Sequence, residues 1–182
     1  IMSLFFIRAF RAAKLDASVF DEVMADTKTT TQAIIVVFLY AAAVAYGIFG
    51  RAGVAGVNSA IVITLVGWYL WAFSIYFAGV RLFPETRTTA DRKAFMRAMG
   101  FASSPGWLCL LGLFPGLGAA VFVGASVWMI VASVIAVKKA LNYTSTYRAA
   151  VLTVVCWIPS FLFQGLMVII ILSAFGVPES QF

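Results

Sequence analysis

The sequence predicts an all-α fold, a polytopic transmembrane helix bundle with five spans and an amphipathic helix in front of them. Of the 182 residues, 63% are hydrophobic and 11% are charged, whereas a soluble chain has about 25% charged residues. The mean hydropathy is +1.02. Long apolar stretches alternate with short charged links. A soluble domain of this size is excluded because it would have too few charges to cover its surface, and the same composition excludes a disordered chain.

The chain opens with an amphipathic stretch over residues 2–15. Its cations Arg8, Arg11 and Lys14 recur at every third position, so they share one face of a helix. The pattern predicts a helix that lies in the membrane interface, with these three cations in contact with lipid headgroups. The alternative is a helix that packs against the protein's own cytoplasmic loops.

Residues 16–30 are the most acidic part of the chain and complete a cytoplasmic N-terminal segment over residues 1–30. Ser18 followed by Asp21 resembles a capping box, which predicts the start of a short second helix. Val19, Phe20 and Val23 are expected to form its buried face.

The remaining residues, 31–182, are predicted to form the transmembrane domain. Crossing a hydrocarbon core of about 30 Å takes about 20 helical residues. Five segments reach or approach this length, at about 32–50, 57–81, 98–115, 119–138 and 149–176.

The third span is the least regular, because it contains Pro105 and Pro115. Proline removes a backbone donor and kinks a helix. In lipid the freed carbonyl groups need partners, which the hydroxyls of Ser103 and Ser104 could supply. The link at 114–119 carries no charge, so spans three and four could instead form a re-entrant hairpin.

The cations between the spans predict the orientation. With five crossings, all but one of the 13 Lys and Arg residues fall on the same side, and Arg51 alone lies opposite. The positive-inside rule then places the N-terminus in the cytoplasm and the C-terminus outside.

Several function classes are disfavoured by what the sequence lacks. It has no histidine, the commonest general base and metal ligand, and no span carries a charge near its middle, which argues against a proton-coupled pump. Cys109 and Cys156 have no partner at metal-ligand spacing. We therefore expect no enzyme activity, metal or cofactor. The net charge of +6 predicts a basic surface toward anionic lipid rather than a nucleic-acid site.

Two groups of residues in the spans are candidate contact sites. Small and kink-forming residues of the third span are predicted to shape a partner-facing bend: Ser103, Ser104, Pro105, Gly106, Gly112, Pro115 and Gly116. Gly112 and Gly116 have the spacing that allows close helix approach. Trp68, Tyr69 and Trp71 lie near the middle of span two, where they could face a partner, a quinone or a pigment, or fill space between helices.

Four runs of sequence together resemble a known family. The third span begins with Arg97-Ala-Met-Gly-Phe-Ala-Ser-Ser-Pro105-Gly106 and ends with Leu113-Phe-Pro115-Gly116-Leu-Gly118. The fourth span runs from Trp128 to Leu141, and Tyr147-Arg148-Ala-Ala opens the fifth. The chain resembles the Yip family of five-span membrane proteins, in its bacterial form.

This resemblance implies five spans, a cytoplasmic N-terminus, a bacterial inner membrane and a non-catalytic membrane role. The Asp-Leu-Tyr-Gly-Pro motif of eukaryotic members is absent and the N-terminal segment is short. Binding of small Rab-type GTPases is therefore not carried over.

We expect an interaction or scaffold protein that contacts the lipid bilayer and other membrane proteins or a second copy of itself, and that could be an accessory subunit of a larger complex. A bound lipid, quinone or pigment could be shared with such a complex. The alternative is a transporter or channel for a small neutral solute, lined by Ser103, Ser104, Ser160 and Gln164.

Overall fold

The computed structural model describes residues 2–50, 53–85, 88 and 91–175, and every element in these ranges is a helix. Their order is α1 (Met2–Ala13), α2 (Ala17–Ala25), α3 (Thr29–Phe49), α4 (Gly53–Phe77) with a π-helical extension η2 (Ala78–Leu82), α5 (Arg92–Ala102), a 3₁₀ helix η3 (Ser104–Leu113), α6 (Gly118–Ala140) and α7 (Thr146–Phe175). The predicted all-α fold class is confirmed.

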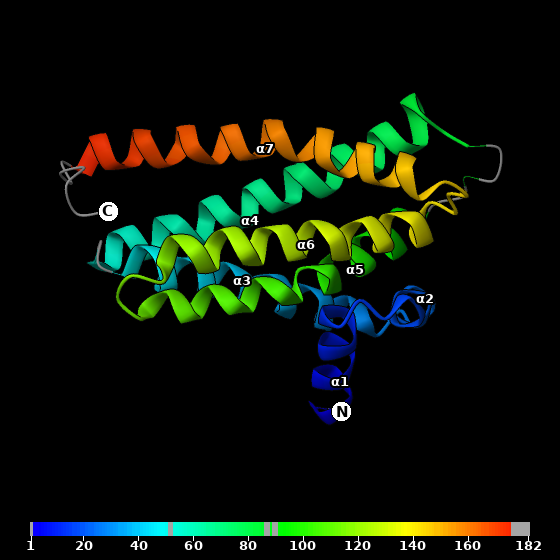
Figure 1. The fold of residues 1–182 in the computed structure, drawn as a ribbon, viewed down its shortest axis with the longest axis horizontal. Coiled ribbons are helices and arrows are strands. Elements are labelled where there is room, and N and C mark those ends of the chain that lie inside the picture. The colour runs from blue at the N-terminus through cyan, green and yellow to red at the C-terminus, as the bar shows by residue number, and fades with distance from the viewer. Residues whose placement is uncertain (1, 51–52, 86–87, 89–90, 176–182) are drawn as a thin grey trace.

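Within the described residues, four helices are long and apolar enough to cross a membrane: Thr29–Ile48, Gly53–Leu82, Gly118–Ala140 and Thr146–Ile170. They correspond to the first, second, fourth and fifth predicted spans. Figure 1 shows them running along the long axis of the molecule, with α7 on one side of α4 and α6, and α3 on the other. The chain is therefore an integral membrane protein by length and composition.

The third predicted span is not one continuous helix. The segment forms α5, of 11 residues, and then η3, of 10 residues, and the two follow one another along the bundle axis (Figure 1). Pro105 stands at the start of η3, where its missing N–H costs no helical hydrogen bond. The α5 helix also begins at Arg92, six residues before the predicted boundary at 98.

The two short N-terminal helices lie at the end of the bundle where α3 begins, called here the α2 end. In Figure 1, α1 points away from the bundle in a direction crosswise to its long axis, and α2 lies beside α1. Leu15, with a positive φ of 64°, lies in the turn between them. The prediction of a capping box at Ser18 is wrong. The N-cap of α2 is Asp16, whose carboxylate accepts the Ser18 N–H at 2.9 Å.

The core is densest around α5. The largest fully buried side chains include Phe20 of α2, Ile75 of α4, and Phe95, Met99 and Phe101 of α5. The predicted buried face of α2, which is Val19, Phe20 and Val23, is confirmed. The α2–α5 contact thus joins the N-terminal segment to the membrane-spanning helices.

Candidate functional site

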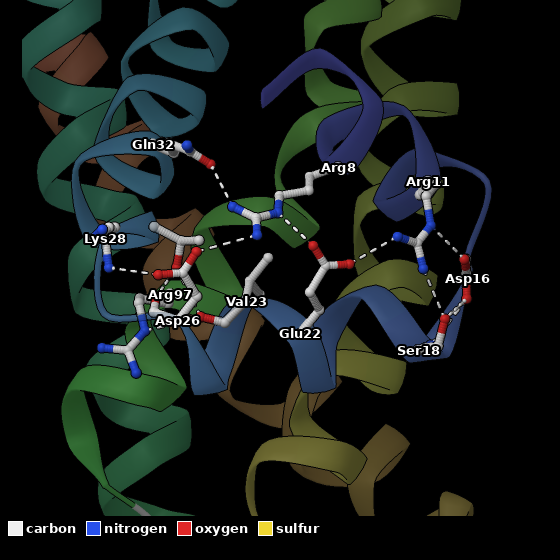
Figure 2. Close-up of polar contacts among 11 residues, drawn as sticks. Arg8, Arg11, Asp16, Ser18, Glu22, Val23, Asp26, Lys28, Gln32 and Arg97 are labelled. Carbon is white, nitrogen blue, oxygen red and sulfur yellow. Dashed lines mark hydrogen bonds and ion pairs between the residues drawn. The ribbon is translucent and has the colours of Figure 1, made fainter. Parts of the chain in front are cut away.

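The charged residues of α1 and α2 form an ion-pair cluster at the α2 end (Figure 2). Arg8 of α1, only 6% exposed, is its centre. Its guanidinium donates to Glu22 at 2.7 Å, to Asp26 at 3.2 Å and to the Gln32 side chain of α3 at 3.3 Å. One buried side chain therefore links α1, α2 and α3.

Arg11 extends the cluster toward the start of α2. Its guanidinium donates to the carboxylates of Asp16 and Glu22, both at 2.8 Å, and to the Ser18 hydroxyl at 2.9 Å. Glu22 thus accepts from both arginines, one at each oxygen. We call Arg8, Arg11, Asp16, Glu22 and Asp26 the arginine–carboxylate cluster.

These hydrogen bonds favour the charged form of the carboxylates. Donation from Ser18, first through its hydroxyl, and from Arg11 lowers the pKa of Asp16 from 3.8 to about 2. The guanidinium of Arg8, followed by that of Arg11, lowers the pKa of Glu22, and partial desolvation opposes the shift. Asp16 and Glu22 are therefore ionised at neutral pH.

The other end of α2 is held by Arg97 of α5. Its Nε donates to the Val23 carbonyl oxygen at 3.0 Å, and Nη2 donates to that of Met24. The Thr29 hydroxyl lies 2.8 Å from the same Val23 oxygen. These donors satisfy carbonyl groups that a helix leaves unpaired at its C-terminus, so α2 is fixed at both ends.

The lipid contact predicted for Arg8 and Arg11 differs from what the structure shows. The carboxylates of α2 occupy both guanidinium groups, which is the alternative arrangement, a helix packed on the protein's own segments. Lys14 is exposed and lies 4.5 Å from the centre of the Phe10 ring. Its contact with headgroups stays a prediction.

Four large apolar side chains of α1 are exposed. Leu4, Phe6, Ile7 and Phe10 are between 44% and 61% exposed. The helix is tied to the bundle by the Trp128 indole N–H of α6, which donates to the Ala13 carbonyl at 2.8 Å. The two arginines of α1 therefore face α2, Phe5 packs into the core, and the other large apolar side chains of α1 are exposed.

The kink residues predicted for the third span divide into two groups. Ser103, Ser104, Pro105 and Gly106 are buried at the α5–η3 junction, where the Ser103 hydroxyl donates to the Met99 carbonyl at 3.1 Å. These four residues therefore pack inside the chain and do not face outward.

Gly112, Pro115 and Gly116 lie at the far end of η3. A Cβ atom on Gly112 would lie 2.5 Å from the Gly47 carbonyl oxygen of α3, so this glycine permits a close contact within the chain. Gly116 has a positive φ of 83° and no neighbour within 4 Å of a Cβ. It therefore serves the turn to α6 and not the predicted helix–helix approach.

The three mid-span aromatic residues have different roles. Trp71, only 3% exposed, donates its indole N–H to the Thr153 carbonyl of α7 at 3.2 Å. Trp68 donates to the Ser103 hydroxyl at 2.8 Å. Tyr69 is 48% exposed. Trp71 and Trp68 thus join helices, which agrees with the alternative that these aromatic residues fill space between helices. Tyr69 is the one of the three that is exposed to an outside partner.

A cavity of about 360 Å³ lies between α3, α4, α6 and α7. Of the four residues predicted to line a solute pathway, Gln164 alone reaches it; the Ser103 and Ser160 hydroxyls bond to backbone carbonyls of their own helices. The walls of this cavity are mostly apolar. In the described part of the chain no three His, Cys, Asp or Glu residues are placed to hold a metal.

Two residues that contact the N-terminal segment at the α2 end, Gln32 and Arg97, were not among the predicted site residues. The sequence places Arg97 at the beginning of the third span and Gln32 at the beginning of the first, and predicts no contact of either with the N-terminal segment. The signal for Arg97 was a lone charge among the apolar residues around it in the middle of α5, since such a group is buried only with partners.

Comparison with known proteins gave one match. The family model described as Yip1 domain matches residues 16–177. No curated protein and no solved structure matches the chain.

Proposed function

The chain belongs to the Yip1 domain family, and from this premise we propose that it is a non-catalytic interaction or scaffold protein of a bacterial inner membrane. In this proposal the N-terminus is cytoplasmic, the C-terminus lies outside, and five segments cross the bilayer. The observation that carries the proposal is the apolar surface of α1 beside the spans, where Leu4, Phe6, Ile7 and Phe10 are exposed.

The geometry of α1 supports a helix lying in the membrane interface. Its exposed side carries Leu4, Phe6, Ile7 and Phe10, and it projects across the bundle axis (Figure 1). An apolar helix face in this position inserts between headgroups and acyl chains. The ion-pair cluster fixes α1 and α2 to the spans, so this helix would be held at a constant depth.

The combined length of α5 and η3 supports this segment as the third of five crossings. An α-helix of 11 residues rises about 16 Å and a 3₁₀ helix of 10 residues about 20 Å. Placed end to end, as in Figure 1, they exceed the hydrocarbon core of about 30 Å. Burial of the junction inside the bundle satisfies the irregular backbone.

Labelling from the two sides tests the topology. Cys109 and Cys156 are buried and would be replaced by serine. A cysteine introduced at Gly118 is expected to react with an impermeant maleimide from outside, and one at Thr144 only after the membrane is opened. If the cysteine at Gly118 reacts only from the cytoplasm, spans three and four form a re-entrant hairpin and the five-span proposal is wrong.

The proposed partner surface is the outer side of η3 and its turn to α6. Its large apolar side chains are 46–60% exposed: Leu110, Leu111, Leu113, Phe114 and Leu117. Because lipid also covers apolar side chains in a bilayer, the feature that favours a protein partner or a second copy is the short 3₁₀ helix next to a proline–glycine turn. An accessory role in a larger complex would use the same surface.

Site-specific photocrosslinking in the source membrane tests this surface. A photoreactive phenylalanine analogue at Leu113 is expected to give one discrete protein adduct. The matched control is the same analogue at Val155, which is 57% exposed on α7, as Leu113 is on η3, and should give lipid adducts only. Lipid adducts alone at both positions would contradict the interaction role.

A further inference from the structure

A groove of about 430 Å³ opens at the α2 end, between α3, α4 and the first turn of α5. Ile34 and Phe38 of α3 form one wall, and Leu65 and Tyr69 of α4 form the other. The start of α5 closes the end nearest α2. This groove is separate from both the arginine–carboxylate cluster and the η3 surface.

The base of the groove is rigid. Trp68, which also lines it, is fixed by the hydrogen bond of 2.8 Å to Ser103. Behind it α5 lies close to α3, since a Cβ atom on Gly100 would come within 2.8 Å of that of Ala33. The groove therefore exists without a ligand to hold it open.

Two cations lie at the α5 end of the groove. Arg92 and Lys93 are exposed, and neither side chain has an ion pair with a residue that the structure describes. The neighbouring Asp91 uses both carboxylate oxygens on the N–H groups of Lys93 and Ala94, each at 3.1 Å. Arg97 also lines the groove, but α2 carbonyl groups occupy its guanidinium.

The groove has the depth of one leaflet. Its α3 wall extends from Thr30 to Phe38, a rise of about 12 Å along the helix, and half of a hydrocarbon core is about 15 Å. Thr30 is at the start of a candidate span, so the cations lie at the headgroup level and the apolar walls lie among acyl chains.

We propose that this groove binds one acidic phospholipid from the leaflet at the α2 end. The phosphate contacts Arg92, whose planar guanidinium suits bidentate binding, and Lys93, and one acyl chain lies between the walls. The unpaired cations select an anionic headgroup over a zwitterionic one. This site is independent of the proposed interaction role, because it requires only that the chain lies in a bilayer.

Native mass spectrometry of the full chain tests the proposal. The protein is reconstituted in vesicles of equal phosphatidylglycerol and phosphatidylcholine, extracted in mild detergent, and weighed with its retained lipids. The charge variant is Arg92→Gln with Lys93→Gln. The matched control, Arg81→Gln with Lys138→Gln, removes the same charge outside the groove, from the exposed Arg81 and the half-buried Lys138.

We expect the wild-type chain to retain one phosphatidylglycerol and the charge variant to bind it about 30-fold more weakly, since each cation near a membrane contributes about fivefold. The control should change by less than twofold. The Ile34→Trp variant, which fills the groove at an exposed position without changing charge, should also lose the lipid.

Several results would overturn the proposal. These are equal retention by the charge variant and its control, equal retention of phosphatidylcholine by the wild-type chain, and full retention of phosphatidylglycerol by Ile34→Trp. A dimer mass without lipid would assign the groove to a second copy and would also overturn it.

Discussion

Replacing Arg8 with glutamine should release α1 and α2 from the bundle while the membrane helices stay folded. The guanidinium of Arg8 makes three contacts, with Glu22, Asp26 and Gln32, and its side chain is 7% exposed. Glutamine removes the charge and cannot reach both carboxylates. The loss falls on the docking of α1, because the contacts lie between α1, α2 and the start of α3.

The magnitude follows from the exposure of the partners. Removing one member of a fully buried ion pair costs about 3–5 kcal/mol. The carboxylates of Glu22 and Asp26 are 35% and 34% exposed, so water can partly solvate them, and Glu22 keeps its contact with Arg11. We therefore expect about 2 kcal/mol, between the buried figure and the 0–1 kcal/mol of surface pairs.

Hydrogen–deuterium exchange of the protein in nanodiscs measures this loss. A decrease of about 2 kcal/mol in local opening free energy should accelerate exchange in α1 and α2 about 30-fold, with α4 unchanged. The control Lys28→Gln removes an exposed charge beside the cluster and should alter exchange by less than twofold. If the Arg8 variant exchanges like the wild-type chain, the cluster does not hold α1, and our account of the N-terminal segment is refuted.

Three further predictions concern acid, close packing and a buried indole. Folding lowers the pKa of Asp16 to about 2 and also lowers that of Glu22. The contribution of these carboxylates to α1 docking should therefore be complete above about pH 5 and be lost as the pH falls from about 4 toward 2. Hydrogen–deuterium exchange of α1 measured across this pH range would show the loss. Gly47→Ala should destabilise the chain by about 2 kcal/mol or more in thermal unfolding, since its Cβ would lie 1.8 Å from a backbone oxygen of η3. The control Gly124→Ala, with open space around the new Cβ, should stabilise the chain by up to about 1 kcal/mol. Equal effects of the two substitutions would contradict the close contact. Trp71→Phe should cost about 1 kcal/mol by removing its hydrogen bond to α7, and an unchanged melting temperature would show that this bond contributes little.

The sequence by itself determined the four long apolar helices and the buried face of α2. Hydropathy and helical periodicity are properties of neighbouring residues, and a bilayer requires each spanning segment to satisfy its own backbone. The composition that excluded a soluble domain and the repeated small residues were visible for the same reason. Proline at position 105 also marked the break in the third span, although not the change to a 3₁₀ helix.

The tertiary structure alone decided what the charged and aromatic side chains do. Arg8 and Glu22 are 14 residues apart, and Arg97 and Val23 are 74 apart, so no local pattern relates them. The spacing of Arg8 and Arg11 placed these two cations on one face of α1, where both reach Glu22, whereas Lys14 lies just beyond the end of the helix. Whether that face meets lipid headgroups or the carboxylates of α2 depends on the turn at Leu15, because a helix face has no partner until the chain folds back on it.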